Sequence, residues 1–176
     1  MDLLAFEGQD LYFDEHMPAE IDLLIKSASE CYGTSEAEAQ LIHAFFLAPD
    51  NLTVLVALYR YYYYQHRYKE ALVVANHALK FSGRRIEFPE NWENLSLDHL
   101  GVGVMKSMGM VRFYLIALKA AGYINLRLHN FELAQDMLRK VVALDSSDRL
   151  GASALLQIAI DYNSNEANEL IRVKQA

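Results

Sequence analysis

The chain repeats itself, and this internal repetition constrains its fold more than any other feature of the sequence. Residues 67–83 and 130–146 align without a gap. In both segments an aromatic residue is followed three positions later by an alanine, and apolar residues then recur at helical spacing. The matched positions are His66, Tyr68 and Ala71 in the first segment, and His129, Phe131 and Ala134 in the second. Such repetition predicts a stack of similar helical units.

A third copy lies earlier in the chain. Ala37 has the same position within SEAEAQLIHAFFLAPDN, where an apolar helical face ends at Pro-Asp-Asn. The sequence thus divides into three units of equal length, the last of which is displaced by an insertion. The predicted divisions are an N-terminal segment 1–17, unit one 18–51, unit two 52–85, the insertion 86–114, unit three 115–148, and a capping helix with a tail at 149–176.

Helix–turn–helix units of about 34 residues are typical of the tetratricopeptide repeat (TPR) family. The chain resembles this family over residues 18–148. The small residue that the family places early in the second helix is present in all three units, whereas the aromatic residue before it is replaced by Thr34 in unit one. The small residue midway along the first helix is present only as Gly122, and the closing proline only as Pro49. The resemblance implies an all-α fold, a right-handed superhelix of stacked antiparallel helix pairs with a C-terminal capping helix.

The insertion is predicted to be a loop followed by a helix. The loop contains Trp92, the one tryptophan of the chain, and Ser96 or Asp98 is suited to begin the helix. A break is expected near Gly103 or Gly109, because each glycine weakens a helix by about 1 kcal/mol relative to alanine. Alternatively these glycines allow close helix contact. Two interpretations of Trp92 stay open: a cover over the seam between units two and three, or a mobile lid over the groove.

Residues 59–68, YRYYYYQHRY, hold six of the eleven tyrosines of the chain. Helical spacing predicts that Tyr59, Tyr62 and Tyr68 face the core, whereas the pattern does not assign Tyr61. In the TPR family the first helices of the units line a concave groove, and the resemblance places further residues there. The predicted groove residues are Lys26, Arg60, Tyr63, Tyr64, Lys119, Tyr123 and Arg127.

Lysine, arginine and tyrosine in one groove suit a partner peptide with a carboxylate and an aromatic or aliphatic anchor. The alternative is that these side chains satisfy one another and leave the groove empty. The acidic and aromatic N-terminal stretch FEGQDLYFDEHMP either caps unit one or folds back over the basic groove. The net charge of −7 disfavours a broad surface for nucleic acid.

The sequence carries none of the patterns that catalysis or a bound metal would need. Its six histidines form no helical ligand motif, and nucleophile elbows and phosphate-binding loops are missing. The single cysteine, Cys31, excludes an internal disulfide and is typical of a buried apolar residue. The N-terminus is acidic where a signal peptide is basic, and the longest apolar run carries two cations. We expect no enzymatic activity, cofactor, metal site or membrane span, and a cytoplasmic location.

We expect instead an interaction module, an adaptor or assembly factor that binds a peptide or helix of a partner protein in its groove. The stretches DLYFDEHMP, LVALYRYYYYQHRY, SMGMVRFYLIALKAAGYINLRL and DRLGASALL are also similar to small TPR proteins associated with bacterial nitrogen-fixation gene sets. That likeness implies an accessory role in maturing or protecting a metalloenzyme. Two alternatives remain: a TPR chaperone of type III secretion, whose repeats lack such an insertion, and a structural subunit that self-associates, for example as a homodimer.

Overall fold

A computed structural model describes residues 17–174 of the chain. All of the regular secondary structure in this part is helical. Seven α-helices and one short 3₁₀ helix follow one another in it, without a β-strand. They are α1 (Ala19–Glu30), α2 (Ser35–Leu47), α3 (Leu52–Tyr64), α4 (Tyr68–Arg85), η2 (Trp92–Asn94), α5 (Leu97–Arg127), α6 (Phe131–Leu144) and α7 (Ala152–Lys174). The predicted all-α class is therefore confirmed.

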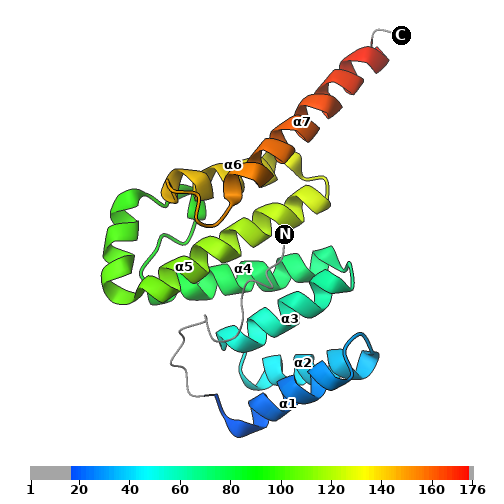
Figure 1. Ribbon diagram of the computed structural model, residues 1–176, viewed down its shortest axis with the longest axis vertical. Helices are drawn as coiled ribbons and strands as arrows, with labels where there is room; N and C mark the ends of the chain where they lie inside the picture. Colours follow the sequence, from blue (N-terminus) through cyan, green and yellow to red (C-terminus); the bar gives the residue numbers. More distant parts are fainter. Residues whose placement is uncertain (1–16, 175–176) are drawn as a thin grey trace.

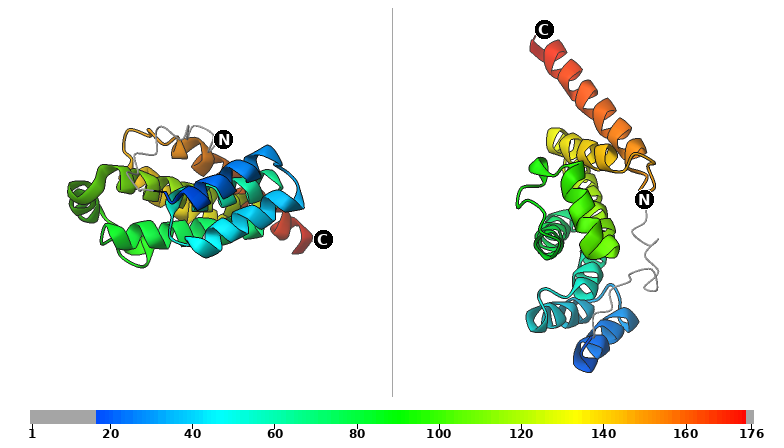
Figure 2. Two further views of the ribbon diagram at one scale, coloured as in Figure 1. Left: turned by 90° about the horizontal axis from the view of Figure 1, so that it is seen from below. Right: turned by 90° about the vertical axis from the view of Figure 1, so that its left-hand side faces the viewer.

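The helices form an elongated stack in chain order, with α1 at one end and α7 at the other (Figures 1 and 2). Each helix packs chiefly against the helices directly before and after it in the sequence. The short connections between α1 and α2, α3 and α4, and α5 and α6 reverse the chain, so these helices lie in adjacent pairs. The third pair begins with α5, which starts inside the predicted insertion 86–114.

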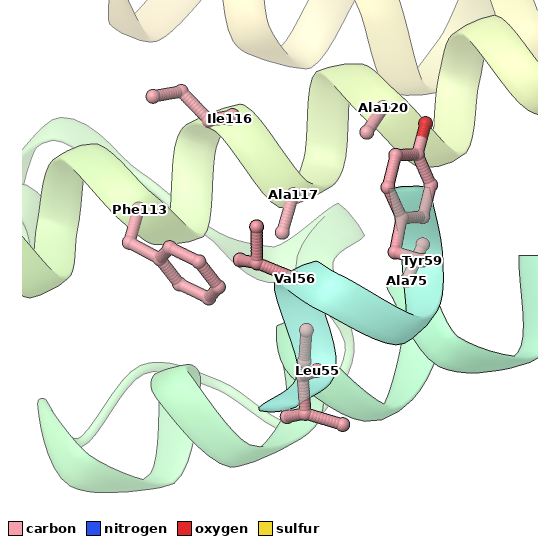
Figure 3. Close-up of a pocket in the computed structure, with 9 residues that line it drawn as sticks. Leu55, Val56, Tyr59, Ala75, Phe113, Ile116, Ala117 and Ala120 are labelled. Carbon is pink, nitrogen blue, oxygen red and sulfur yellow. The ribbon is translucent and has the colours of Figure 1, made fainter. Parts of the chain in front are cut away.

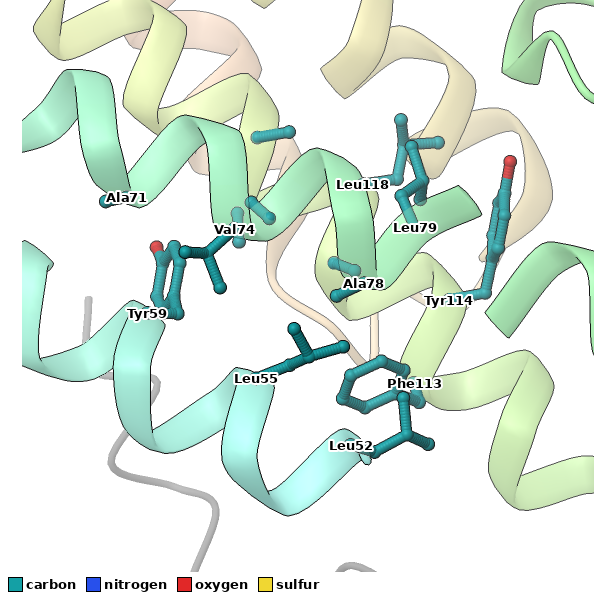
Figure 4. Packing of buried hydrophobic residues seen from close by; sticks show 14 of the residues in the cluster. Leu52, Leu55, Tyr59, Ala71, Val74, Ala78, Leu79, Phe113, Tyr114 and Leu118 are labelled. Carbon is teal, nitrogen blue, oxygen red and sulfur yellow. The ribbon is translucent and has the colours of Figure 1, made fainter. Parts of the chain in front are cut away.

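The largest apolar core lies where α3, α4 and α5 meet (Figure 4). Leu55 from α3, Val74 from α4 and Leu118 from α5 are all buried there. Each large aliphatic side chain buried in this way contributes about 1.5–3 kcal/mol to stability. The alanines of α4, including Ala71 and Ala78, lie in the same cluster and let the neighbouring helices approach closely.

Helix α5 contains a sharp break, and it falls at Ser107, between the two glycines near which the sequence predicts one. The backbone of Ser107 is extended (φ −161°, ψ 107°), and its hydroxyl accepts a hydrogen bond from the N–H of Met110 at 3.2 Å. Ser107 thus caps the second half of the helix. Gly103 serves the alternative role of close contact, since a Cβ there would lie 2.5 Å from the ring of Phe88.

The sequence predicts either Ser96 or Asp98 as the residue that begins α5, and the structure shows which of the two does so. Ser96 is the N-cap, and its N–H donates to Nδ1 of His99 at 3.2 Å in a capping box.

By length and composition alone, α5 is one helix of the described chain that could cross a membrane, although 44% of its apolar stretch is buried inside the protein. Core helices of folded proteins share these properties, and α5 packs against both α4 and α6.

The C-terminal unit is one long helix rather than a capping helix with a separate tail. Asp148 lies just before it and accepts hydrogen bonds from the N–H groups of Ala152 at 2.7 Å and Ser153 at 3.1 Å. The first turns of α7 pack on α6, where Leu155 and Ala159 are buried. The remainder of α7 continues as a helix to Lys174 and extends away from the stack (Figure 1).

The turns inside units two and three are built identically. His66 and His129 both have a left-handed backbone, with φ of 57° and 62°. The N–H of the following residue bonds to the carbonyl five positions back, Arg67 to Tyr62 and Asn130 to Asn125, each at 2.9 Å. Together with the bonds from the two histidine N–H groups, these are Schellman turns, which normally place glycine at the left-handed position. Here the position is occupied by histidine, and each histidine ring packs on the aromatic residue that begins the next helix.

Arg67 connects unit one to unit two. Its guanidinium forms ion pairs with Glu38 of α2 at 2.7 Å and with Glu70 of α4 at 2.8 Å, and it lies over the ring of Tyr62, 4.7 Å from the ring centre. Arg67 therefore belongs to the interface between two helix pairs as well as to the turn. Asn130 has the equivalent position in unit three and donates to the buried amide oxygen of Asn125 at 3.0 Å.

Replacing His129 by valine is expected to lower the free energy of unfolding by about 1–2 kcal/mol, because a β-branched side chain is disfavoured in the left-handed region. Asparagine tolerates this region, so His129→Asn should be nearly neutral. Chemical denaturation followed by circular dichroism measures both. An equal loss in the asparagine variant would show that the histidine ring, rather than the backbone, maintains the turn.

Candidate functional site

The tyrosines of α3 divide between the core and one face of the stack. Tyr59 and Tyr62 are buried, which confirms the prediction for both, and Tyr68 is half-buried. Tyr61, which the helical pattern leaves unassigned, is also buried: its hydroxyl donates to the carbonyl of Thr34 at 2.9 Å. Tyr64 is 37% exposed and Tyr63 half-buried, so the tyrosines that the sequence places in the groove are the more accessible ones.

Arg60 and Tyr64 lie together in a pocket between α1, α2 and α3, which we call the Arg60 pocket. Its volume is about 510 Å³. Apolar side chains from all three helices form much of its wall, and Ser29, Tyr32, Arg60 and Tyr64 supply the polar groups. The full lining is Ile25, Ala28, Ser29, Tyr32, Leu41, Ala57, Arg60 and Tyr64.

The guanidinium of Arg60 forms no ion pair with another residue in the described part of the chain. The carbonyl of Arg60 accepts a hydrogen bond from the hydroxyl of Tyr32 at 3.2 Å, which ties the turn after α1 to α3. Tyr32 is absent from the predicted groove because it lies in that turn, where helical periodicity gives no information. The pocket therefore holds one positive charge among apolar and phenolic groups.

Three predicted groove residues, Tyr63, Tyr64 and Tyr123, contact one another and two further rings. We call this network the tyrosine cluster of Tyr59, Tyr63, Tyr64, Tyr68 and Tyr123. The rings of Tyr63 and Tyr64 meet edge to face at 5.2 Å, and those of Tyr59 and Tyr63 stack at 6.0 Å. The hydroxyl of Tyr63 donates to that of Tyr123 at 3.4 Å. Burial, together with this hydrogen bond, raises the pKa of Tyr63 well above its ordinary value.

Arg127 completes this network. It donates to the hydroxyl of Tyr123 at 3.2 Å, and its guanidinium lies 4.7 Å from the centre of the Tyr68 ring. Such a cation–π contact contributes about 0.5–1 kcal/mol at an exposed site. Tyr63, Tyr123 and Arg127 therefore bind one another, as in the alternative in which the groove side chains satisfy each other. Arg60 is not part of this network.

The two lysines predicted for the groove lie elsewhere. Lys26 is an exposed residue that pairs with Asp22 at 2.6 Å, one turn earlier on α1. Lys119 donates to the carbonyl of Leu150 at 2.5 Å, in the loop before α7, and burial lowers its pKa despite the carboxylates of Asp148 and Asp145. Neither lysine lines the Arg60 pocket, so the structure does not bring the four predicted cations together.

Trp92 lies over the seam between α4 and α6, away from the Arg60 pocket. It is half-buried in η2 and packs against the main core. Lys140 of α6 fixes this segment by donating to the carbonyls of Glu93 at 2.7 Å and Leu95 at 3.0 Å. This location agrees with the first of the two interpretations of Trp92, in which it covers the seam between units two and three.

A further cavity, of about 40 Å³, lies inside the core between α3, α4 and α5 (Figure 3). Tyr59 is the one lining residue with a polar side chain, and alanines such as Ala75, Ala117 and Ala120 leave the space open. A cavity so small and apolar is a packing gap. Among the side chains that the structure describes, those of residues 17–163, no group of three or more His, Cys, Asp or Glu could hold a metal ion. The N-terminal stretch that the sequence assigns to a cap or a groove cover lies mainly outside the described residues.

Comparison with known proteins gives a match that spans most of the chain. An uncharacterized 19.8 kDa protein in the nifW 5′ region of Azotobacter chroococcum mcd 1 is 45% identical over 164 residues, which cover 93% of this chain and 92% of that protein. The chain belongs to the family of that protein. No family model and no solved structure matches the chain. The likeness to TPR proteins therefore depends on the repeat positions and the order of the helices.

Raising the pH above about 10 is expected to destabilise the fold, because buried phenols ionise first in the unfolded chain. Burial raises the pKa of Tyr59 far above its ordinary value of 10.0 in the folded state. The stabilising contribution is therefore complete below pH 10 and decreases as pH rises toward the folded pKa, by up to about 1.4 kcal/mol per pH unit for each such phenol.

The Tyr59→Phe variant should show a shallower decrease of unfolding free energy with pH, measured by urea denaturation between about pH 8 and pH 11. Tyr162→Phe is a matched control, because Tyr162 is 55% exposed on α7. Equal slopes for Tyr59→Phe and the unchanged protein would mean that the Tyr59 phenol is not desolvated in the folded state.

Proposed function

We propose that this protein is a non-enzymatic interaction module that binds a peptide or helix of a partner protein on the face formed by α1 and α3. The proposal includes a TPR-like right-handed superhelix for residues 18–148, in which this face is concave. Its support is the order of adjacent helix pairs and the identical Schellman turns at His66 and His129. Small residues also support it: a Cβ on Gly122 would lie 3.1 Å from Leu138, so glycine at that position lets α5 and α6 approach closely.

The Arg60 pocket is the observation that carries the proposal. It combines a cation that has no ion-pair partner among the side chains of residues 17–163 with exposed parts of Tyr32 and Tyr64. Arginine and tyrosine are enriched among the residues that contribute most to protein interfaces. An aliphatic or aromatic anchor fits the apolar wall, and a carboxylate of the partner would bind the Arg60 guanidinium as a charge-assisted pair.

The relative encoded near nifW supports a pathway for this activity. We place the protein in the cytoplasm, as an accessory factor that helps to mature or protect a nitrogen-fixation metalloenzyme by binding another protein rather than a metal or nucleic acid. Its acidic net charge of −7 is compatible with a protein partner and unfavourable for a nucleic acid.

A self-associating structural subunit is the second candidate, because the first half of α5 exposes apolar side chains. Met105 is 91% exposed, and Leu97, Val102 and Met108 are each more than half exposed. Contiguous exposed apolar residues are typical of interaction surfaces. In this alternative the apolar face of residues 97–108 joins two copies, and the Arg60 pocket has no client.

The test is affinity capture from nitrogen-fixing cells that express the protein natively, followed by a binding titration with the captured partner. Arg60→Glu should weaken binding about 30-fold or more, since reversal of a central charge removes at least about 2 kcal/mol. Arg112→Glu, a reversal at an exposed position of α5, is the matched control and should bind like the unchanged protein.

Equal binding by both variants would contradict the proposed site, provided that circular dichroism shows both to be folded. Sedimentation of Met105→Lys tests the second candidate in parallel. A dimer that this substitution dissociates, together with no captured partner, would favour the structural subunit over the interaction module.

A further inference from the structure

A second pocket, which shares no residue with the Arg60 pocket, lies between α4, α6 and the loop that leads to η2. We call it the Trp92 pocket. Its volume is about 790 Å³, within the range of about 300–1,000 Å³ that is usual for small-molecule sites. Its wall contains Leu79, Phe88, Trp92, Leu133 and Met137 as apolar side chains, and Asn76, Lys80, Arg84, Glu90 and Asn91 as polar ones.

Two cations lie one helical turn apart on the α4 side of this pocket. Lys80 and Arg84 are both exposed, and neither forms an ion pair within the described part of the chain. Like charges at this spacing repel each other, so the pair does not stabilise α4. Glu90 is the one acidic residue in the lining, which leaves the pocket with an excess of positive charge.

Tyr114 adds a further polar group to this pocket. Its side chain is only 2% exposed and its hydroxyl forms no hydrogen bond in the described part of the chain, but the hydroxyl is not sealed off from solvent. The ring is held in place by Phe88, which meets it edge to face at 4.9 Å, and by Gly83, where a Cβ would lie 2.9 Å from it. Its hydroxyl lies at the edge of the apolar cluster (Figure 4). Burial raises the pKa of Tyr114 to about 12, so the hydroxyl remains a donor at neutral pH.

We propose that the Trp92 pocket binds a small amphipathic anion. A carboxylate or phosphate head lies between Lys80 and Arg84, and an apolar body packs against Phe88, Trp92 and Met137. The hydroxyl of Tyr114 donates a hydrogen bond to the bound molecule in place of one to water. This binding activity is separate from partner recognition at the Arg60 pocket and does not depend on it.

The single tryptophan of the chain provides a direct measurement, because Trp92 lines the pocket. Decanoate, decyl phosphate and uncharged decanol are titrated into the full-length protein while Trp92 fluorescence is recorded. A saturable change is expected for at least one of the two anions, and which of them binds more tightly identifies the preferred head group. Decanol should bind about tenfold more weakly or worse, because it lacks the charge that the two cations recognise.

Two variants separate the proposed site from unspecific binding. Lys80→Gln/Arg84→Gln should weaken binding of the anion about tenfold or more and leave decanol binding unchanged, whereas Arg112→Gln should alter neither. Tyr114→Phe should weaken binding several-fold without lowering resistance to urea, since its hydroxyl has no partner to lose. No saturable fluorescence change, equal affinities for decanol and both anions, or full binding by the folded double variant would each overturn the proposal.

Discussion

The packing of α4 between α3 and α5 is the contact on which the rest of the molecule depends. It joins the helices before the insertion to those after it, and alanines along α4 make the close approach feasible. The two candidate sites lie on either side of this contact. The Arg60 pocket is formed where α3 meets α1 and α2, whereas the Trp92 pocket is formed where α4 meets the insertion and α6. The Arg60 pocket therefore lies on α3 and the Trp92 pocket on α4, the two members of the central helix pair.

The concentration of tyrosine in α3 has more than one physical explanation. Tyr59, Tyr61 and Tyr62 fill the core as large apolar side chains, and the hydroxyl of Tyr61 satisfies a backbone carbonyl. Tyr63 belongs to a network with Tyr123 and Arg127 that spans α3 and α5. Of the tyrosines on α3, Tyr64 is the one that combines substantial exposure with a place in a pocket beside a cation.

The sequence predicts the architecture better than it predicts the groove. Repeated positions such as Ala71 and Ala134 locate the helix pairs, because burial of one helical face leaves a periodic pattern. The same periodicity assigns Lys119 to a face but cannot show that its ammonium group reaches the carbonyl of Leu150. The left-handed histidines and the break at Ser107 depend on backbone geometry, for which single-residue preferences are weak guides.

Because each helix contacts chiefly its neighbours in the sequence, most contacts in this protein connect segments that are close along the chain. Proteins with such local contacts cross a small entropic barrier and fold rapidly, and a linear stack can begin at one pair and grow from there. The pair α3–α4, completed by α5, holds the largest core and is the natural nucleus. During synthesis, the N-terminal pairs can therefore assemble while the ribosome is still adding α7.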